Sequence, residues 1–463
     1  MSVTKRAAFA GMLLVTTVGV GVCGSTFQAN SAHPQSSPFV LPIVKRDSLL
    51  NGLQLITLEH QGTRTVKAHL RINTGALFDL AGKGGLADIT AGMLLRGAGG
   101  LSTKDFTNAV DQSGLAVNVT TEWDSTDILI TGSADSLESI FDLLGKMLIS
   151  PSFDEKELAA LKSTRATGLA KDVQDDSVLV QRKAVEALFG SYPFGRPLRG
   201  TAESVGRITR PDVVYFHNRF YIANNSELLV TGDATAEQVT RLARAKLGAW
   251  KKGEKVPPTF RPPESQSARR VFILNRPNEK SAMAAIAQVG VSRRANDYFA
   301  ALVMFVLLRQ EMSKIAAARP STLVDADFET HTLAGPLILG VKSASSDLVD
   351  NLDEILNMMA RMQSAAPSSD QVEEVKAKLI ASMADRLKST DEAGGVILDI
   401  ETYGLGRDYI VTLADRVSAI TPADVQRAAQ TYLKPQSVTI VIAGPASQLE
   451  SVMKKVGTVA VLK

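Results

Sequence analysis

The chain has 463 residues, of which 45% are hydrophobic, and its 51 Lys and Arg nearly balance its 48 Asp and Glu. This apolar fraction is large enough to fill sizeable cores, which argues against global disorder, and a formal charge of +3 lacks the basic excess typical of nucleic-acid-binding proteins. One Cys and five His exclude a disulfide framework and a Cys-based zinc site, so a metal would need His and carboxylate ligands.

The first residues have the features of an export signal. Lys5 and Arg6 precede an apolar run of about sixteen residues, shorter than the ~20 that a membrane-spanning helix needs. We therefore expect a signal segment at 1–24 and a flexible leader at 25–43, which is rich in Ser, Gln and Pro. The protein is predicted to be exported, either periplasmic or secreted. Membrane attachment through an uncleaved N-terminal segment, or through a lipid on Cys23, stays open as an alternative.

A Pro-rich segment divides the rest of the chain. Residues 253–267 include four Pro among polar residues, and Pro fits neither a helix interior nor a central strand. We therefore predict a linker at 253–267 between an N-terminal domain at 44–252 and a C-terminal domain at 268–463.

The two predicted domains repeat each other. Ile208-Thr-Arg-Pro-Asp opens a helical stretch that leads to a strand ending at Gly232, and Ile420-Thr-Pro-Ala-Asp opens one that leads to a strand ending at Gly444. The two helix starts are 212 residues apart, and so are the two glycines. Thr followed by Pro and Asp is typical of a helix N-terminus, because Thr accepts from free amides and Asp favours the positive end.

A second pair of segments agrees with this repeat. A strand at 127–133 with a helix at 136–144 resembles a strand at 337–343 with a helix at 348–356, and each helix has apolar residues every three or four positions. Strands and helices that do not strictly alternate favour an α+β fold. We predict two homologous duplicated domains, each a largely antiparallel sheet packed with helices.

Several short motifs follow one another along the chain. They are Gly84-Gly-Leu-Ala87, Arg96-Gly97, Leu188-Phe-Gly190, Tyr192-Pro-Phe-Gly195, Gly200-Thr-Ala-Glu-Ser204, Asn224-Asn225 and Thr231-Gly-Asp233. In this order they resemble the insulinase/pitrilysin-type zinc metallopeptidase family, from about Val44 to the C-terminus. The resemblance implies two homologous α+β domains, with an active site assembled from both halves or with a partner subunit.

Active members of that family carry His-x-x-Glu-His on a helix directly after Gly-Leu-Ala. Two His four residues apart hold one zinc from one helical face, and the Glu deprotonates a zinc-bound water. Here Asp88 stands at the first His position, Ala91 at the Glu position and Gly92 at the second His position. The family's third ligand, a later Glu, aligns with Gly168. The nearby His69 lies in a predicted strand and is interpreted as a strand-face residue. Because a catalytic zinc needs three protein ligands, the resemblance implies no catalytic and no metal-binding residues here.

A second family signature is an Arg and a Tyr seven residues apart in the C-terminal domain, which bind substrate and stabilise charge on the scissile carbonyl. Alignment places Ile315 and Thr322 at these two positions. The pair is therefore predicted to be lost, with the nearby Arg319 as an alternative cation or simply a solvated residue at a helix end.

In the resembling family an extended peptide adds to the edge of the N-terminal domain's sheet through backbone hydrogen bonds. Residues 114–121 resemble that edge strand and are rich in β-branched side chains, with Asn118, Val119 and Thr120 as the positions that would pair with the peptide. An ordinary strand without a ligand is an equally supported interpretation.

These observations predict an exported, catalytically inactive insulinase-type peptidase homologue. It would act as the non-catalytic subunit of a heteromeric zinc peptidase or as a protein that binds extended peptides. No cofactor is expected, and zinc would belong only to a paralogous partner subunit. The alternative is an active zinc metalloendopeptidase with an unrecognised ligand set. A serine hydrolase has no support, because no Gly-x-Ser-x-Gly motif occurs.

Overall fold

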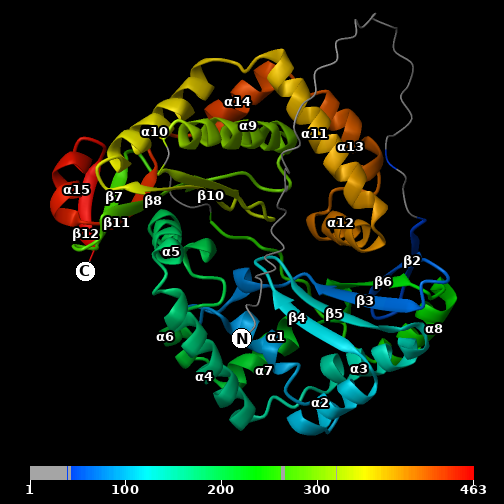
Figure 1. The fold of residues 1–463 in the computed structure, drawn as a ribbon. Helices are drawn as coiled ribbons and strands as arrows, with labels where there is room; N and C mark the ends of the chain where they lie inside the picture. Colours follow the sequence, from blue (N-terminus) through cyan, green and yellow to red (C-terminus); the bar gives the residue numbers. More distant parts are fainter. Residues whose placement is uncertain (1–38, 40–42, 262–265, 320, 463) are drawn as a thin grey trace, which may run out of the picture.

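The computed structural model describes residues 39, 43–261, 266–319 and 321–462, which form two halves, one above the other in Figure 1. The expected signal segment with Cys23 and nearly all of the expected leader lie outside the described residues. The linker is described except for 262–265, and its described part contains no helix or strand. Among the described helices, none is long and apolar enough to cross a membrane.

The first half is a sheet with most of its helices on the lower side in Figure 1. Its strands are β1 (Lys45–Ser48), β2 (Gln54–Glu59), β3 (Thr65–Ile72), β4 (Ala116–Thr121), β5 (Thr126–Ser133) and β6 (Ser226–Gly232). Its α-helices are α1 (Leu86–Met93), α2 (Thr103–Gln112), α3 (Leu137–Ile149), α4 (Glu155–Asp172), α5 (Asp176–Phe189), α6 (Ala202–Gly206), α7 (Arg210–Phe220) and α8 (Ala236–Leu247).

The second half repeats this plan above the first. Its strands are β7 (Arg270–Asn275), β8 (Ser281–Val289), β9 (Leu323–Phe328), β10 (Pro336–Ala344), β11 (Thr439–Gly444) and β12 (Thr458–Leu462). Its helices are α9 (Tyr298–Ala317), α10 (Leu348–Ser364), α11 (Ser369–Lys388), α12 (Thr390–Tyr403), α13 (Tyr409–Ser418), α14 (Pro422–Tyr432) and α15 (Ala446–Met453).

Both sheets share one strand order over five positions. The order β2-β6-β3-β5-β4 in the first half corresponds to β7-β11-β8-β10-β9 in the second, and only the first two strands of each run parallel. The sixth position differs, because β1 pairs antiparallel with β2, whereas β12 comes from the far end of the chain and pairs parallel with β7. The prediction of two duplicated α+β units with mostly antiparallel sheets is confirmed.

The repeated helix starts are capping boxes in both halves. The backbone N–H of Thr209 donates to Asp212 Oδ2 at 2.8 Å, and that of Thr421 donates to Asp424 Oδ2 at 2.8 Å. Each box satisfies amides that a helix N-terminus leaves free, which explains why α7 and α14 begin at equivalent residues.

The two halves pack on each other reciprocally. Helix α12 of the second half lies on β6 of the first, and helix α5 of the first half lies on β8 and β11 of the second. Gly394 permits the first contact, because a Cβ there would lie 2.6 Å from Leu229 Cδ2. Trp123 and Phe194 share a buried cluster with Val441 of the second half. The two sheets are therefore fixed relative to each other by apolar contacts in both directions.

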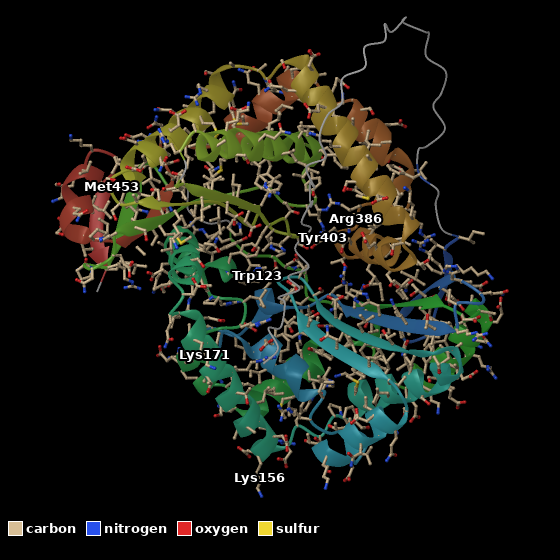
Figure 2. All side chains as sticks on the ribbon, in the orientation of Figure 1. Trp123, Lys156, Lys171, Arg386, Tyr403 and Met453 are labelled. Carbon is tan, nitrogen blue, oxygen red and sulfur yellow. The ribbon has the colours of Figure 1, made fainter. Side chains whose placement is uncertain are left out.

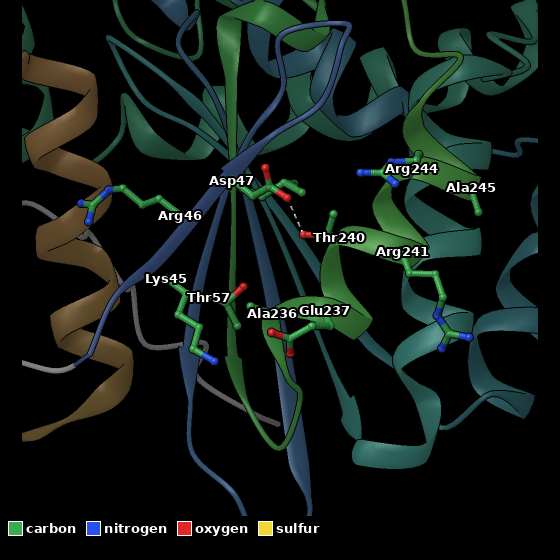
Figure 3. A pocket seen from close by; sticks show the side chains of 11 residues that line it. Lys45, Arg46, Asp47, Thr57, Ala236, Glu237, Thr240, Arg241, Arg244 and Ala245 are labelled. Carbon is green, nitrogen blue, oxygen red and sulfur yellow. Dashed lines mark hydrogen bonds between the residues drawn. The ribbon is translucent and has the colours of Figure 1, made fainter.

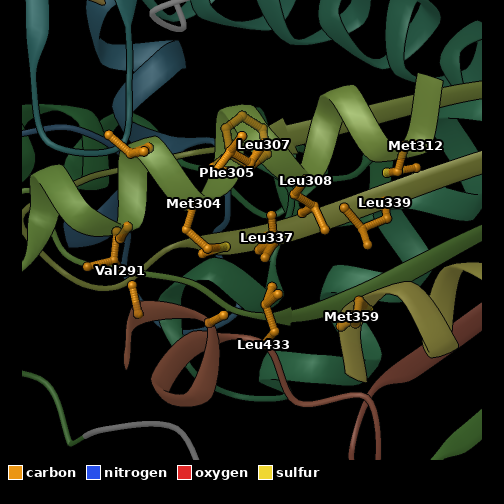
Figure 4. Packing of buried hydrophobic residues seen from close by; sticks show 14 of the residues in the cluster. Val291, Met304, Phe305, Leu307, Leu308, Met312, Leu337, Leu339, Met359 and Leu433 are labelled. Atoms are coloured by element: carbon orange, nitrogen blue, oxygen red, sulfur yellow. The ribbon is translucent and has the colours of Figure 1, made fainter. Parts of the chain in front are cut away.

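A large apolar core lies mainly in the second half and also includes Ile56, Leu58 and Leu229 of the first. Figure 4 shows Met304 and Leu308 of α9 packed over Leu337 and Leu339 of β10, and all four are 1% exposed or less. Such a close-packed layer holds α9 in place.

Candidate functional site

Helix α1 begins at a turn that requires glycine. Gly85 has φ of 89°, and a Cβ there would lie 2.5 Å from the carbonyl oxygen of Arg199. The buried carboxylate of Asp79 accepts from the N–H groups of Gly85 at 2.6 Å and Ala87 at 2.7 Å, which satisfies amides of the first turn. Burial raises the pKa of Asp79 to about 7. These contacts fix the start of α1 against the loop that carries Arg199.

Asp88 and Gly92 of α1, which align with the two His residues of the family motif, face Arg165 of α4. Arg165 Nε lies 2.8 Å from Asp88 Oδ2, and Nη2 donates to Asp88 Oδ1 at 3.3 Å. A Cβ at Gly92 would lie 3.8 Å from Arg165 Nη2 and 3.0 Å from Leu161 Cδ2. The guanidinium therefore lies beside both positions that hold His in the family motif. Ala91, at the Glu position, is buried and brings only a methyl group.

The charge at this site differs from that of a metal site. Asp88 is 7% exposed, and burial raises its pKa, whereas Arg165 and Arg199 act to lower it. A zinc of the family type needs three His or carboxylate ligands. The residues present do not fit this metal, because the single carboxylate is already paired with a cation. Across the described part of the chain, no three His, Cys, Asp or Glu side chains are grouped as metal ligands would be.

Gly168, the position aligned with the third ligand, follows Arg165 on α4. It is exposed, and a Cβ there would meet no heavy atom within 4 Å. The α4 side chain that contacts Asp88 is Arg165, which sequence reasoning missed. Arg165 is 77 residues from Asp88, and a lone Arg on a helix carries no pattern that would reveal its partner.

Strand β4 is an edge of its sheet, as the sequence predicts. Asn118, Val119 and Thr120 pair with residues 127–129 of β5, and in the described chain no strand pairs with the other side of β4. Antiparallel pairing engages the backbone groups of alternate residues, so the remaining groups face outward. Helix α1, which carries the positions aligned with the zinc-binding motif, packs against β4 and so lies beside the open edge.

The turn after β4 is held by the second half. Asp124 Oδ2 accepts from the N–H of Thr332 at 3.1 Å and from the hydroxyl of Tyr403 at 3.4 Å, and it lies 3.3 Å from His331 Nδ1. The ring of Trp123 lies edge-on to that of His331 at 6.4 Å, and Figure 2 labels Trp123 and Tyr403 where the halves meet. The end of β4 is therefore positioned by both halves.

A buried ion network continues from this turn. Asp127 lies 2.6 Å from His69 Nε2 and accepts from Arg71 Nε at 2.7 Å, and Arg71 Nη1 reaches Asp399 of α12 at 2.7 Å. Burial disfavours the charged form, but Arg71 and His69 hold the pKa of Asp127 well below its ordinary value. The interpretation of His69 as a strand-face residue agrees with this contact.

Ile315 and Thr322, the positions aligned with the family's Arg and Tyr, are both buried. Ile315 belongs to the apolar core, and Thr322, 5% exposed, accepts from Asn351 Nδ2 at 3.3 Å. Arg319 Nη1 donates to Asn351 Oδ1 at 2.5 Å. Neither position carries a group that would bind a peptide, and the guanidinium of Arg319 is engaged inside its own half.

A groove lies elsewhere, between β1, β2 and α8. It has a volume of about 790 Å³, and Figure 3 shows its charged lining. Asp47 Oδ2 accepts from Thr240 Oγ1 at 2.9 Å, Lys45 pairs with Glu59, and Arg46 pairs with Glu401. None of the sequence-predicted positions lines this groove.

Comparisons with known proteins agree with this architecture. Residues 55–202 match the family model of insulinase (peptidase family M16), and residues 207–379 match the model of the peptidase M16 inactive domain. The fold and the site thus define a two-domain peptidase-like protein. The chain belongs to the insulinase family, M16, which confirms the resemblance seen in the sequence.

Two relatives illustrate the range of the match. An uncharacterized zinc protease of Rickettsia bellii is 22% identical over 207 residues, 45% of this chain and 50% of that protein. The probable mitochondrial-processing peptidase subunit beta of Schizosaccharomyces pombe is 23% identical over 431 residues, 87% of this chain and 92% of that protein. The match thus covers about half the length of the Rickettsia relative and most of the yeast one.

Solved structures share the fold at low identity. A peptidase M16 inactive domain from Pseudomonas fluorescens has a TM-score of 0.79 and 21% identity, covering 87% of this chain and 98% of that one. The first half of the periplasmic protease PqqL from Escherichia coli has a TM-score of 0.71 and 16% identity, covering 91% of this chain and 95% of that one.

Proposed function

We propose that this chain is an exported, catalytically inactive member of the insulinase family that holds extended peptides on the open edge of β4. The observation that carries the proposal is the ion pair between Arg165 and Asp88, which sets a guanidinium beside the positions of both His residues of the family motif. A fixed cation there disfavours a second cation, and the three remaining aligned positions offer no metal-binding side chain.

Peptide holding does not depend on the lost residues. Backbone groups on the free side of β4 would pair with a peptide of almost any sequence, while side-chain positions would tune preference. The end of this edge is fixed through Asp124 by the second half, so little ordering would be needed on binding.

Elemental analysis of the purified full-length chain tests the absence of a zinc site. We expect far less than one zinc per chain after incubation with zinc and desalting, for both the natural chain and Asp88→Asn. One tightly held zinc per chain that is lost in Asp88→Asn would instead support an active peptidase with an unrecognised ligand set.

A role beside a zinc-carrying paralogous subunit is the second candidate. Relatives named as a mitochondrial-processing peptidase subunit and a structural neighbour within complex III favour it, because both belong to multi-subunit assemblies by name. Co-purification of the tagged chain with a paralogue carrying His-x-x-Glu-His, and peptidase activity that rises only in the mixture, would support it. A chain that stays alone and changes no such paralogue's activity would favour peptide binding by itself.

A further inference from the structure

We propose that the guanidinium groups of Arg165 and Arg199 bind a carboxylate of the peptide that pairs with β4, either its free C-terminus or an acidic side chain. The inference rests on the proposed peptide-holding function and names the chemical class of peptide that the site prefers.

Arg165 has donors to spare after pairing with Asp88. Its side chain remains 35% exposed, whereas that of Asp88 is 10% exposed. Nε is buried beside Asp88 Oδ2 without a hydrogen bond, and Nη2 donates to that carboxylate, so Nη1 carries the donors that remain for a ligand. The exposed side of the guanidinium is therefore available to a second carboxylate.

Arg199 adds a second cation beside the same helix. Its carbonyl oxygen packs on Gly85 at the start of α1, and its side chain is exposed. In the described chain its guanidinium has no ion pair or hydrogen bond. Its charge acts to lower the pKa of both Asp88 on α1 and Glu122 just after β4, so it lies within electrostatic reach of both.

The carboxylates near these arginines are paired or only partly ionised. Glu329, which also acts to raise the pKa of Glu122, lies 3.2 Å from His331 Nε2. Asp88 compensates one cation, and burial with the neighbouring Asp127 raises the pKa of Glu122 to about 7, so Glu122 is only partly ionised at neutral pH. Asp127 itself is engaged by Arg71 and His69. An anionic group brought along β4 toward Thr121 would therefore approach the exposed side chains of Arg165 and Arg199.

Guanidinium groups suit this ligand because their planar donors match the two oxygens of a carboxylate. A peptide paired with β4 has its backbone held by the strand edge, so its carboxylate would reach the arginines without a further ordering cost. Preference for an anionic group would thus be added to a binding mode that is otherwise tolerant of sequence.

The test uses the full-length chain and three forms of one fluorescent extended peptide, Val-Thr-Val-Ser-Ala: the free acid, the C-terminal amide, and the amide with Glu as the last residue. Fluorescence anisotropy gives the Kd of each form. We expect the plain amide to bind about tenfold more weakly than the better carboxylate form, about 1.4 kcal/mol. Comparison of the acid with the Glu amide identifies the source of the carboxylate.

Two variants locate the effect. Arg199→Gln and the charge-neutral pair Arg165→Gln with Asp88→Asn should each shrink the difference between carboxylate and amide forms, while the amide's Kd stays unchanged. Equal binding of all three forms by the natural chain would overturn the inference and leave peptide holding intact.

A third variant separates that failure from failure of the proposed function. Asn118→Pro places a ring on the strand edge and should weaken all three forms alike. Absence of binding by any form, or binding that Asn118→Pro does not change, would contradict the β4 site itself.

Discussion

Arg165 of α4 and Asp88 of α1 form an ion pair, with Nε 2.8 Å from Oδ2, where the two helices meet. In the family motif this is the position of the first zinc-binding His. The molecule thus keeps the helix, the flanking motifs and the sheet edge of a peptidase, while a fixed side-chain cation accompanies the one remaining carboxylate.

Arg165→Gln should destabilise the protein, because it leaves the carboxylate of Asp88 buried without its cation. We expect the free energy of unfolding to fall by about 1–3 kcal/mol, the cost of an unsatisfied buried group. Urea denaturation measures it. The double variant with Asp88→Asn should recover most of the loss, and an equal loss in both variants would show that the pair is not coupled.

Restoring the family's residues should reveal the effect of Arg165 on a metal. The fourfold variant Asp88→His, Ala91→Glu, Gly92→His and Gly168→Glu supplies the aligned ligand set. Adding Arg165→Ala should raise its zinc affinity by about tenfold or more, because a cation beside the metal is removed. Competition with a chromogenic chelator measures the affinity, and an unchanged affinity would show that Arg165 does not oppose the metal.

Two adjacent glycines of α12 should respond in opposite directions. Gly394→Ala places a Cβ 2.6 Å from Leu229 Cδ2 and should destabilise by about 1–3 kcal/mol through overpacking between the halves. Gly395→Ala meets nothing within 4 Å and should stabilise by about 0.5–1 kcal/mol through helix propensity. Thermal unfolding of both variants gives the comparison. Similar changes in unfolding temperature for the two variants would show that α12 is not closely packed against β6 at Gly394.

Stability should fall as pH rises from about 4.5 to 9, first through Glu122 and then through His331. Burial and Asp127 raise the pKa of Glu122 from 4.5 to about 7, so the folded state holds this proton more tightly than the unfolded chain. Burial lowers the pKa of His331, but Asp124 and Glu329 outweigh it and raise that pKa to about 9, so stability from charged His331 is also lost at high pH. We expect a decrease of about 2–4 kcal/mol by urea denaturation.

Glu122→Gln and His331→Gln serve as controls for this pH dependence. Each should flatten part of the decrease, Glu122→Gln between about pH 4.5 and 7 and His331→Gln between about pH 6.5 and 9. A rise in stability over the same range would contradict the assignment of these groups.

Much of the fold could be predicted from the sequence because the two halves of the chain repeat the same pattern of helix starts and strands. The capping boxes at Thr209 and Thr421 depend on residues three apart, and strand patterns such as that of β5 are local. Strands β1 and β12, which form one edge of each sheet, could not be predicted in the same way. β1 and β12 fill equivalent edges from opposite ends of the chain and in opposite orientations, which no repeat reveals.

At the candidate site, the sequence could predict only which residues stand at the positions of the family's metal ligands and general base. The motif register locates Asp88, Ala91 and Gly92, and the structure places all three on α1. The surroundings of these residues depend on contacts between distant segments. Arg165, which pairs with Asp88, comes from α4, and Thr332, whose N–H donates to Asp124, comes from the second half. Such contacts follow from tertiary packing, not from any local pattern.

We propose that the chain holds peptides without cutting them, and one measurement tests this directly. The full-length chain with added zinc is incubated with the Val-Thr-Val-Ser-Ala peptide, binding is followed by anisotropy, and the recovered peptide is weighed by mass spectrometry. We expect saturable binding and intact peptide. Cleavage fragments that form at a rate proportional to the chain and disappear with a chelator would contradict this proposal.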